Sequence, residues 1–445
     1  MTSYDEAVAA LADRGRYGIR LGLGRTRALL RELGHPERQL RGVLVGGTNG
    51  KGSVLALAGS ALRAAGYRVG ETPKPHLVSY RERLQIDGHP IAPAAFAALV
   101  GEVVPVADRV ARRLGPPTEF ELLTAMLFAW FARERVDVAM VEVGLGGRLD
   151  ATHAWDGGVA AITNVALDHM AQLGDTIPKI AREKAAIIER GDLAVTGATG
   201  EALDVIRRRA RRMGVSLVEA SPPRVLGWDR DGLEVELPRR GRTRVGLRGR
   251  HQAANLAVAD AVLDALAAAG IATVPDDQRR RGYADARWPG RLELLDVAGR
   301  DVLLDGAHNP AGAAALAAAL DDLRPFLRPP NGPLTLVVGA MADKDVGGIV
   351  DALTGAEALR GARVLVTQVD LPRAMPAAEL ARMWHARAGD RVAQVRSIPE
   401  AAAALDAAIA SARGPVVVAG SLYLVGAARR RWVDDPELRD AEDMA

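Results

Sequence analysis

The chain has 445 residues, of which 49% are hydrophobic and 4% aromatic, and its formal net charge is +3. This length allows two or three domains with substantial cores, and so small a charge gives no reason to expect nucleic acid as a partner. The absence of cysteine excludes disulfides, thiolate metal sites and cysteine nucleophiles. No stretch of about 20 residues is apolar and uncharged, and the first residues lack the basic and apolar segments of a signal peptide. We therefore expect a cytoplasmic protein without a membrane span.

Apolar, strand-like runs alternate along the chain with alanine-rich helical segments, which is typical of parallel sheets covered by helices. The sequence pattern changes over residues 224–249, where short polar–apolar alternations predict a small antiparallel section. The strand-like runs are residues 43–45, 136–143, 159–165, 193–196, 303–305, 334–338, 364–367 and 416–419. We expect an α/β protein with a P-loop-type parallel sheet domain over residues 1–290, which includes the antiparallel section. A smaller Rossmann-like α/β domain should follow over residues 291–445.

The segment Gly47-Thr48-Asn49-Gly50-Lys51-Gly52-Ser53 joins the first strand-like run to a helical pattern over residues 54–65. Such a loop presents main-chain N–H groups and the positive end of a helix dipole to an anion. Lys51 adds a charge for the β- and γ-phosphates, and Ser53 offers a hydroxyl for Mg²⁺. The strict P-loop pattern is not met, because Val45 stands at its first glycine and Gly52 at its Ser or Thr. We interpret the segment as a nucleoside triphosphate site; the alternative is a glycine-rich turn with a solvated Lys51.

Two later strand-like runs end in polar side chains. Glu142 lies at the end of residues 136–143, where a carboxylate near a phosphate loop is placed to be a Mg²⁺ ligand or a catalytic base. A strand-end salt bridge with Arg148 is the alternative. His169 follows the next run; a lone histidine there is usually structural, and only its position in the same sheet favours a functional role.

Lys184 lies at helical spacing on the apolar stripe of a helix predicted over residues 176–188. Desolvation lowers the pKa of a lysine on such a face, so part of its amine is neutral. A neutral amine can react with CO₂ to give a carbamate, whose oxygens can bind a second Mg²⁺. The alternative is a lysine that snorkels or pairs with Glu183 or Glu142. The residues alone leave both possibilities open.

The motifs of this chain, taken together, resemble those of folylpolyglutamate synthase/dihydrofolate synthase, a branch of the Mur ligase superfamily. They follow the family's order over residues 4–426. The motifs are residues 47–53, Pro75-His76-Leu77, Tyr80-Arg81-Glu82-Arg83, Phe120-Glu121-Leu122-Leu123-Thr124, residues 142–152, Asp168-His169, Arg182-Glu183-Lys184-Ala185 and Asp305-Gly306-Ala307-His308-Asn309-Pro310.

The resemblance implies a cytoplasmic, ATP-dependent amide ligase of folate biosynthesis and one-carbon metabolism. ATP would phosphorylate a pterin carboxylate, and the amine of L-glutamate would then displace phosphate from the acyl phosphate, with ADP as the other product. The expected partners are ATP, Mg²⁺, L-glutamate and a folate or dihydropteroate, with neither nucleic acid nor membrane, and we expect a monomer.

Roles for individual residues are carried over by motif from the resemblance. Ser53 and Glu142 would bind one Mg²⁺, while His169 and a carbamylated Lys184 would hold a second. Asn255 in His251-Gln252-Ala253-Ala254-Asn255 and Arg291 in Pro289-Gly290-Arg291 resemble ATP contacts. Asp305 and His308 would lie near the nucleotide and the glutamate. The alternative for residues 305–310 is a strand-to-helix turn in which Asn309 caps a helix that begins at Pro310.

One motif departs from the family. Where the family usually has Thr-Ser-Pro-His, this chain has Pro73-Lys74-Pro75-His76. An ammonium group cannot ligate Mg²⁺, so Lys74 either contacts a phosphate or the carboxylate tail of a polyanionic folate, or displaces one metal. Our hypothesis is that activity survives with Lys74 acting electrostatically.

Two other functions are compatible with the sequence: a Mur-type ligase with another acceptor, and a nucleotide-binding protein without ligase activity. The sequence does not decide between dihydropteroate and tetrahydrofolate as the pterin substrate, and it leaves the polyglutamate length open.

Overall fold

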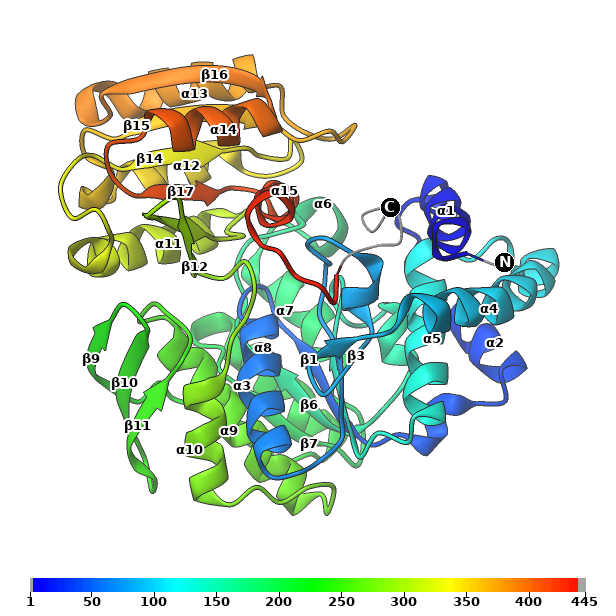
Figure 1. Ribbon diagram of the computed structural model, residues 1–445. Helices are drawn as coiled ribbons and strands as arrows, with labels where there is room; N and C mark the ends of the chain where they lie inside the picture. The colour runs from blue at the N-terminus through cyan, green and yellow to red at the C-terminus, as the bar shows by residue number, and fades with distance from the viewer. Residues whose placement is uncertain (1–2, 439–445) are drawn as a thin grey trace. The chain divides into compact units, whose positions relative to one another are not determined.

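The computed structural model describes residues 3–438, which form two compact units (Figure 1). Of these residues, the first unit contains 3–222, 254–285 and 435–438, and the second contains 223–253 and 286–434. Strands of the first unit are β1 (Gly42–Gly46), β2 (Val69–Thr72), β3 (Gln85–Ile86), β4 (His89–Pro90), β5 (Val138–Glu142), β6 (Gly158–Ile162), β7 (Leu193–Thr196) and β8 (Leu217–Glu219). They form one sheet in the order β4-β3-β2-β5-β1-β6-β7-β8.

The central strands of this sheet are parallel, and β3 and β4 add an antiparallel edge. Strands β1 and β5 are buried along their whole length, as expected for parallel strands covered on both faces. Because β2, β5, β1 and β6 are parallel neighbours, the residues that follow them meet at one edge of the sheet. Lys74, Glu142, the glycine loop and residues 163–169 are therefore brought to the same edge.

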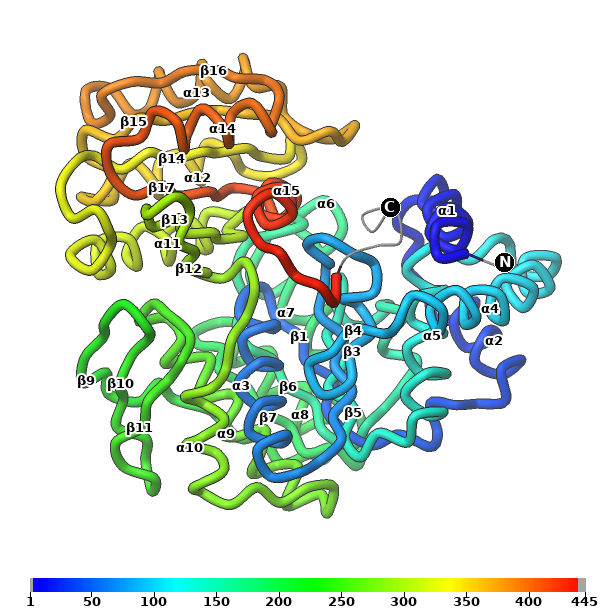
Figure 2. Tube along the Cα trace, viewed as in Figure 1, coloured from blue at the N-terminus to red at the C-terminus, as the bar shows by residue number. Residues whose placement is uncertain are grey.

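Helices cover both faces of the first sheet. The unit contains α1 (Tyr4–Arg14), α2 (Gly24–Glu32), α3 (Lys51–Ala64), α4 (Pro93–Leu114), α5 (Glu119–Arg133), α6 (Met170–Leu173), α7 (Ile177–Ala185), α8 (Gly200–Met213), nearly all of α9 (Gln252–Ala268) and α10 (Asp276–Asp285). Crossovers between parallel strands are right-handed. The β1–α3–β2 crossover runs in the opposite direction from β6–α7–β7 and β7–α8–β8, so α3 covers one face while α7 and α8 cover the other. Helix α10 packs on α3 (Figure 2).

The second unit begins with a three-stranded antiparallel sheet of β9 (Arg224–Asp229), β10 (Gly232–Leu237) and β11 (Gly241–Val245). Its larger sheet has the order β12-β13-β17-β14-β15-β16 and is parallel except for β12. The strands are β12 (Glu293–Val297), β13 (Arg300–Leu304), β14 (Thr335–Val338), β15 (Arg363–Gln368), β16 (Gln394–Glu400) and β17 (Val416–Ala419).

The strand order of the larger sheet assigns its helices to two faces. The chain moves in one direction from β13 through β14 and β15 to β16, and then returns to β17. Right-handed crossovers therefore place α11 (Pro310–Leu323), α12 (Val346–Thr354) and α13 (Ala377–Ala388) on one face, and α14 (Ala401–Ser411) on the other. Helix α15 (Leu422–Trp432) packs beside α14 and β17. A core of buried Leu, Val and Ala side chains, with Trp384, joins the α11–α13 layer to the sheet.

The α/β fold class, the predicted strands and the antiparallel section are confirmed, but the domain division at residue 290 needs a correction. Residues 223–253 pack with the second unit and not with the first. The physical reason is that Arg230 pairs with the buried Asp301 carboxylate, and Trp228 Nε1 donates to Asp322 O at 3.2 Å. These partners lie more than 70 residues further along the chain, so the local sequence pattern does not reveal them.

No helix within residues 3–438 is long and apolar enough to cross a membrane.

Candidate active site

The glycine loop after β1 is held in place by the segment that follows β6. Thr48 N donates to Asn164 O at 2.9 Å, and Asn49 N donates to Asn164 Oδ1 at 3.0 Å. Thr163 Oγ1 donates to Asn49 O at 2.6 Å. Helix α3 begins immediately after the loop, with Gly50 at its N-cap. The loop is thus a fixed turn at a helix N-terminus, the arrangement that binds phosphate groups.

Lys51 is turned back over the loop and is not a solvated surface lysine. Its Nζ donates to Gly47 O at 3.2 Å and to Thr48 O at 3.0 Å, and it lies 3.8 Å from Glu142 Oε1. Arg148, the alternative partner considered for Glu142, instead pairs with Glu183 at 2.9 Å. The structure therefore brings a lysine and the strand-end carboxylate together beside the loop.

Lys184 also faces the loop from helix α7. The residue is 5% exposed, and its Nζ donates to Gly47 O at 2.8 Å. The pKa of this amine is lowered to about 7, chiefly by burial and also by the charge of Lys51, while Asp168 and Asp150 oppose the shift. The prediction of a desolvated lysine at this place is confirmed. Its carbamylation stays a prediction.

His169 lies at the same edge of the sheet, in the segment after β6. It caps α6 with a left-handed backbone, φ = 50°, and its Nε2 is 3.9 Å from Asp168 Oδ1. The main-chain N–H of His169 also donates to Asp168 Oδ1, at 2.8 Å. Asp168 acts on Lys184 electrostatically, so this segment and α7 share one polar region.

The residues predicted to bind Mg²⁺ fit that ion to different degrees. Ser53 and Glu142 offer a hydroxyl and a carboxylate, both buried beside the phosphate loop, and oxygen is the donor that Mg²⁺ prefers. Lys184 in its unmodified form is a hydrogen-bond donor and does not fit, whereas its carbamate would. Within residues 3–438, no group of three or more His, Asp or Glu side chains is arranged to hold a metal ion. Such a group would not include Ser53 or Lys184, because among the four predicted ligands only Glu142 and His169 are of these residue types.

Asn255, which the resemblance assigns to ATP, lies against the glycine loop. A Cβ atom added to Gly50 would lie 2.2 Å from Asn255 Oδ1, and Asn255 is 7% exposed. Helix α9 thus places an amide at the N-cap of α3. Its contact with a nucleotide stays a prediction.

Arg291, Asp305 and His308 belong to the second unit. Asp305 Oδ2 accepts from Leu292 N at 2.9 Å, Asp305 Oδ1 accepts from Ala307 N at 2.9 Å, and His308 Nδ1 is 2.8 Å from Gly306 O. A Cβ atom on Gly306 would lie 2.1 Å from Arg291 Nη1. The structure therefore brings Arg291 and Asp305 together at the end of β13.

The turn that follows Asp305 has the local structure that its sequence suggested. Asn309 caps α11 by accepting from Gly312 N at 2.8 Å, and Pro310 is the first residue of that helix. The structural alternative for residues 305–310 is thus confirmed as local structure, and their roles toward ATP and glutamate stay predictions.

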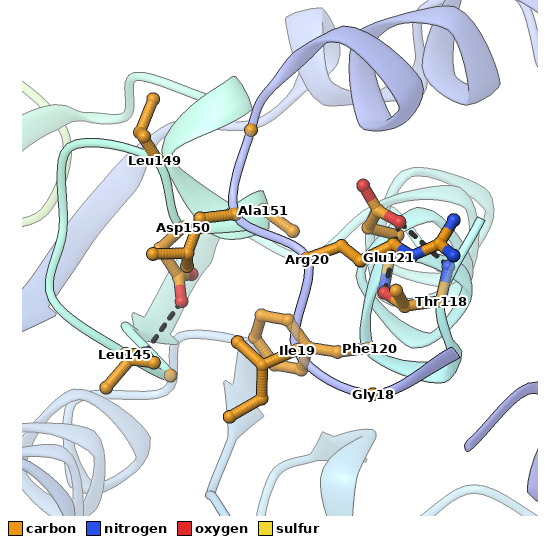
Figure 3. A pocket seen from close by; sticks show the side chains of 13 residues that line it. Gly18, Ile19, Arg20, Thr118, Phe120, Glu121, Leu145, Leu149, Asp150 and Ala151 are labelled. Atoms are coloured by element: carbon orange, nitrogen blue, oxygen red, sulfur yellow. Dashed lines mark hydrogen bonds between the residues drawn. The ribbon is translucent and has the colours of Figure 1, made fainter. Parts of the chain in front are cut away.

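A cavity of about 170 Å³ in the first unit was not foreseen from the sequence (Figure 3). It is lined by Gly18, Ile19, Arg20, Leu21, Gly22, Thr118, Phe120, Glu121, Gly144, Leu145, Leu149, Asp150 and Ala151. Phe120 presents its ring to the cavity, and Asp150 faces it from the loop after β5 (Figure 3). We call it the Phe120 pocket. The sequence feature that could have indicated this pocket is Gly18-Ile19-Arg20-Leu21-Gly22, in which two apolar residues stand between glycines. In the structure, Ile19 is 63% exposed and Leu21 is 39% exposed.

Asp150 explains how the turn after β5 keeps its form. Its Oδ2 accepts from Leu145 N at 2.8 Å, and its Oδ1 accepts from Thr152 N at 3.0 Å and from Thr152 Oγ1 at 2.6 Å. On the other side of the pocket, Thr118 and Glu121 form the capping box of α5. The walls of the pocket are therefore fixed by buried hydrogen bonds.

The second unit and the whole fold both resemble known ligases. Residues 290–422 match the model of the Mur ligase, glutamate ligase domain. A solved structure of Mycobacterium tuberculosis folylpolyglutamate synthase, complexed with ADP and AMPPCP, superposes with a TM-score of 0.85 at 34% identity, covering 96% of this chain and 99% of that one. The fold is that of a Mur-type ligase.

Two curated relatives specify the family. The dihydrofolate synthase/folylpolyglutamate synthase of Bacillus subtilis is 36% identical over 390 residues, which are 85% of this chain and 88% of the relative. A probable bifunctional folylpolyglutamate synthase/dihydropteroate synthase of Haloferax volcanii is 36% identical over 96% of this chain, which spans only 50% of that relative's length. The chain belongs to the folylpolyglutamate synthase/dihydrofolate synthase family.

Proposed function

We propose that this protein is an ATP-dependent ligase that joins L-glutamate to the carboxylate of a pterin, either dihydropteroate or a tetrahydrofolate polyglutamate. The observation that carries the proposal is the common edge of the first sheet. There the glycine loop, Lys51, Glu142 and Lys184 lie together, and the loop after Glu142 continues into the wall of the Phe120 pocket. A triphosphate site and a site for a flat, partly apolar molecule are thus neighbours in one unit.

The proposed reaction has two steps. A carboxylate oxygen of the pterin substrate forms a bond to the γ-phosphorus of ATP, and the bond to the β–γ bridging oxygen breaks, with its electron pair leaving on ADP. The neutral amine of L-glutamate then attacks the acyl carbon. The tetrahedral intermediate expels phosphate, and the nitrogen loses a proton, which leaves an amide. Neither step needs a protein nucleophile, so the protein acts by positioning and charge stabilisation.

Each candidate site residue of the first unit has a role in this scheme. The main-chain N–H groups at the start of α3 and the Lys51 ammonium bind the phosphates, while Asn255 orients the loop at Gly50. Mg²⁺, held by Ser53 and Glu142 when it is bound, would supply positive charge to the phosphate oxygens. His169 and the carbamate of Lys184 would offer donors for a second ion. In the second unit, Arg291, Asp305 and His308 would serve the nucleotide and the glutamate.

The Phe120 pocket is the proposed site of the pterin ring. The Phe120 ring can stack on a flat heterocycle, and the main-chain groups of residues 18–22 and 144–145 offer polar partners at the rim. Its mainly apolar lining with a few polar groups suits an aromatic ligand.

The proposal is tested by measuring ADP release and pterin glutamylation with ATP, Mg²⁺ and L-glutamate. Parallel reactions contain dihydropteroate, tetrahydrofolate or no pterin. ADP release that requires both glutamate and one pterin is expected, and the pterin that supports it identifies the branch of the family. ADP release that is equal without pterin, or no release in any reaction, would contradict the proposal.

A further inference from the structure

Lys74 occupies an unusual position in the first unit, immediately after strand β2. Its Nζ donates to the main-chain oxygen of Glu142 at 2.6 Å, and its own main-chain N–H donates to Glu142 Oε2 at 3.1 Å. The same Nζ lies 4.5 Å from the centroid of the Phe120 ring. The ammonium is therefore fixed by the end of β5 on one side and by an aromatic ring on the other.

These contacts place Lys74 between the glycine loop and the Phe120 pocket. Glu142 lies 3.8 Å from Lys51, which folds over the glycine loop. Phe120 lines the pocket, as does Gly144, two residues after Glu142. A molecule that fills the Phe120 pocket and extends toward the glycine loop must therefore approach the Lys74 ammonium.

A positive charge at this junction suits one part of the substrate. The reacting carboxylate has to come close to a triphosphate, so two anions must approach each other. Lys51 already serves the loop, whereas Lys74 contacts the ring that lines the pocket. An ammonium has three donors, of which one is used on Glu142 O. The remaining donors can bind a carboxylate, and partial burial strengthens a charge-assisted hydrogen bond.

We propose that Lys74 binds the reacting carboxylate of the pterin substrate and holds it at the junction of the Phe120 pocket and the glycine loop. This inference rests on the proposed function, because it requires a substrate whose carboxylate reaches from the pocket toward the loop. Lys74 is thus a substrate-binding residue at a position where the family usually has a serine.

The test compares two ligands of nearly the same shape: dihydropteroate and its carboxamide, in which a neutral amide replaces the carboxylate and so removes its charge and one acceptor oxygen. Binding is measured by fluorescence titration without ATP, for the unmodified protein and for Lys74→Met and Lys74→Arg. Lys179→Met is the matched control, because Lys179 is an exposed lysine of the same unit, and its ammonium pairs with the exposed Asp175. Binding of AMPPCP to each variant shows that the glycine loop is intact.

The unmodified protein should prefer the acid over the amide by roughly 10- to 100-fold, the range expected for a hydrogen bond to a charged group. Lys74→Met should lose this preference through weaker binding of the acid alone, while Lys74→Arg keeps part of it and Lys179→Met keeps all of it. An unchanged preference in Lys74→Met, or an equal loss of both ligands, would overturn the proposal for Lys74 and leave the ligase function standing. If the unmodified protein binds neither ligand, the same comparison is made with tetrahydrofolate and its γ-carboxamide; absence of binding in both pairs would overturn both proposals.

Discussion

The buried amine of Lys184 and the ammonium of Lys51 both donate to the main-chain oxygen of Gly47, at 2.8 Å and 3.2 Å. One carbonyl of the glycine loop thus anchors a lysine from α7 and a lysine from α3. Like charges so close together disfavour two ammonium groups, and burial together with the charge of Lys51 lowers the pKa of Lys184. This pair links the shape of the phosphate loop to the protonation of Lys184.

The neutral form of Lys184 should take up CO₂. With a pKa near 7, the neutral fraction falls as the pH decreases through 7, so carbamate formation should be weak at pH 6 and strong at pH 8. We expect a ¹³C NMR carbamate signal from ¹³C-bicarbonate that follows this dependence and is missing in Lys184→Arg. A signal of equal strength in Lys184→Arg would contradict the assignment.

Gly50→Ala should weaken nucleotide binding. The new Cβ would lie 2.2 Å from Asn255 Oδ1, and the backbone at this position has φ = +82°. Gly66→Ala is the matched control, because Gly66 has φ = +86° and a Cβ atom added there would meet no other atom within 4 Å. Both variants should lose about 1 kcal/mol of unfolding free energy from the backbone strain. Only Gly50→Ala should also bind AMPPCP at least tenfold more weakly. Equal AMPPCP affinities in the two variants would show that the contact between Gly50 and Asn255 does not affect nucleotide binding.

Asp192 should make the stability of the fold depend on pH. The pKa of this carboxyl is raised to about 8, chiefly by burial and also by Asp156, while a hydrogen bond from Glu189 N opposes the shift. Since the folded pKa lies above the ordinary value of 3.8, the stabilisation is complete below pH 3.8 and is lost as the pH rises through 8. Asp192→Asn imitates the protonated form.

The unfolding free energy of Asp192→Asn, relative to the unmodified protein, should therefore increase between pH 5 and pH 8. The increase is at most about 1.4 kcal/mol per pH unit for one group. Urea unfolding at several pH values measures it, with Asp108→Asn, an exposed carboxylate of the same unit, as control. A constant difference across this range would contradict the shifted pKa.

Arg25 should support pterin binding through the wall of the Phe120 pocket. Its Nε donates to both oxygens of Glu121 at 3.0 Å, and its Nη2 donates to Arg20 O at 3.1 Å. Arg25→Met removes the link between α5 and residues 18–22, so KM for the pterin should rise several-fold while KM for ATP is unchanged. Arg27→Met, on the exposed side of the same helix, should leave both values unchanged. An equal rise in both KM values for Arg25→Met would indicate a general structural defect instead.

The local features of this site could be predicted from the sequence, because each depends on neighbouring residues. The glycine loop is one such feature, and the strand-end Glu142 and the apolar stripe around Lys184 are others. Each of these patterns lies within a few consecutive positions of the sequence. The capping of α11 by Asn309 is also a local pattern, and it was expected as an alternative to function. The resemblance to a family added Asn255, whose contact with Gly50 spans about 200 residues and has no local signature.

Other features depend on contacts between distant segments. The Phe120 pocket forms where residues 18–22, α5 and the loop after β5 meet, and none of these segments alone indicates a cavity. The attachment of residues 223–253 to the second unit rests on ion pairs such as Arg230–Asp301. Lys74 was expected to act electrostatically, but its contacts with Glu142 and Phe120 required the packing of β2 against β5.

The acyl phosphate is the central element of the proposed function, and isotope transfer tests it most directly. The pterin substrate is labelled with ¹⁸O in both oxygens of its reacting carboxylate, and the phosphate released with ATP, Mg²⁺ and L-glutamate is analysed by mass spectrometry. One ¹⁸O atom should appear in phosphate for each glutamate that is joined, because the bridging oxygen of the acyl phosphate leaves with phosphorus. Unlabelled phosphate, formed while the glutamylated product accumulates, would contradict the account.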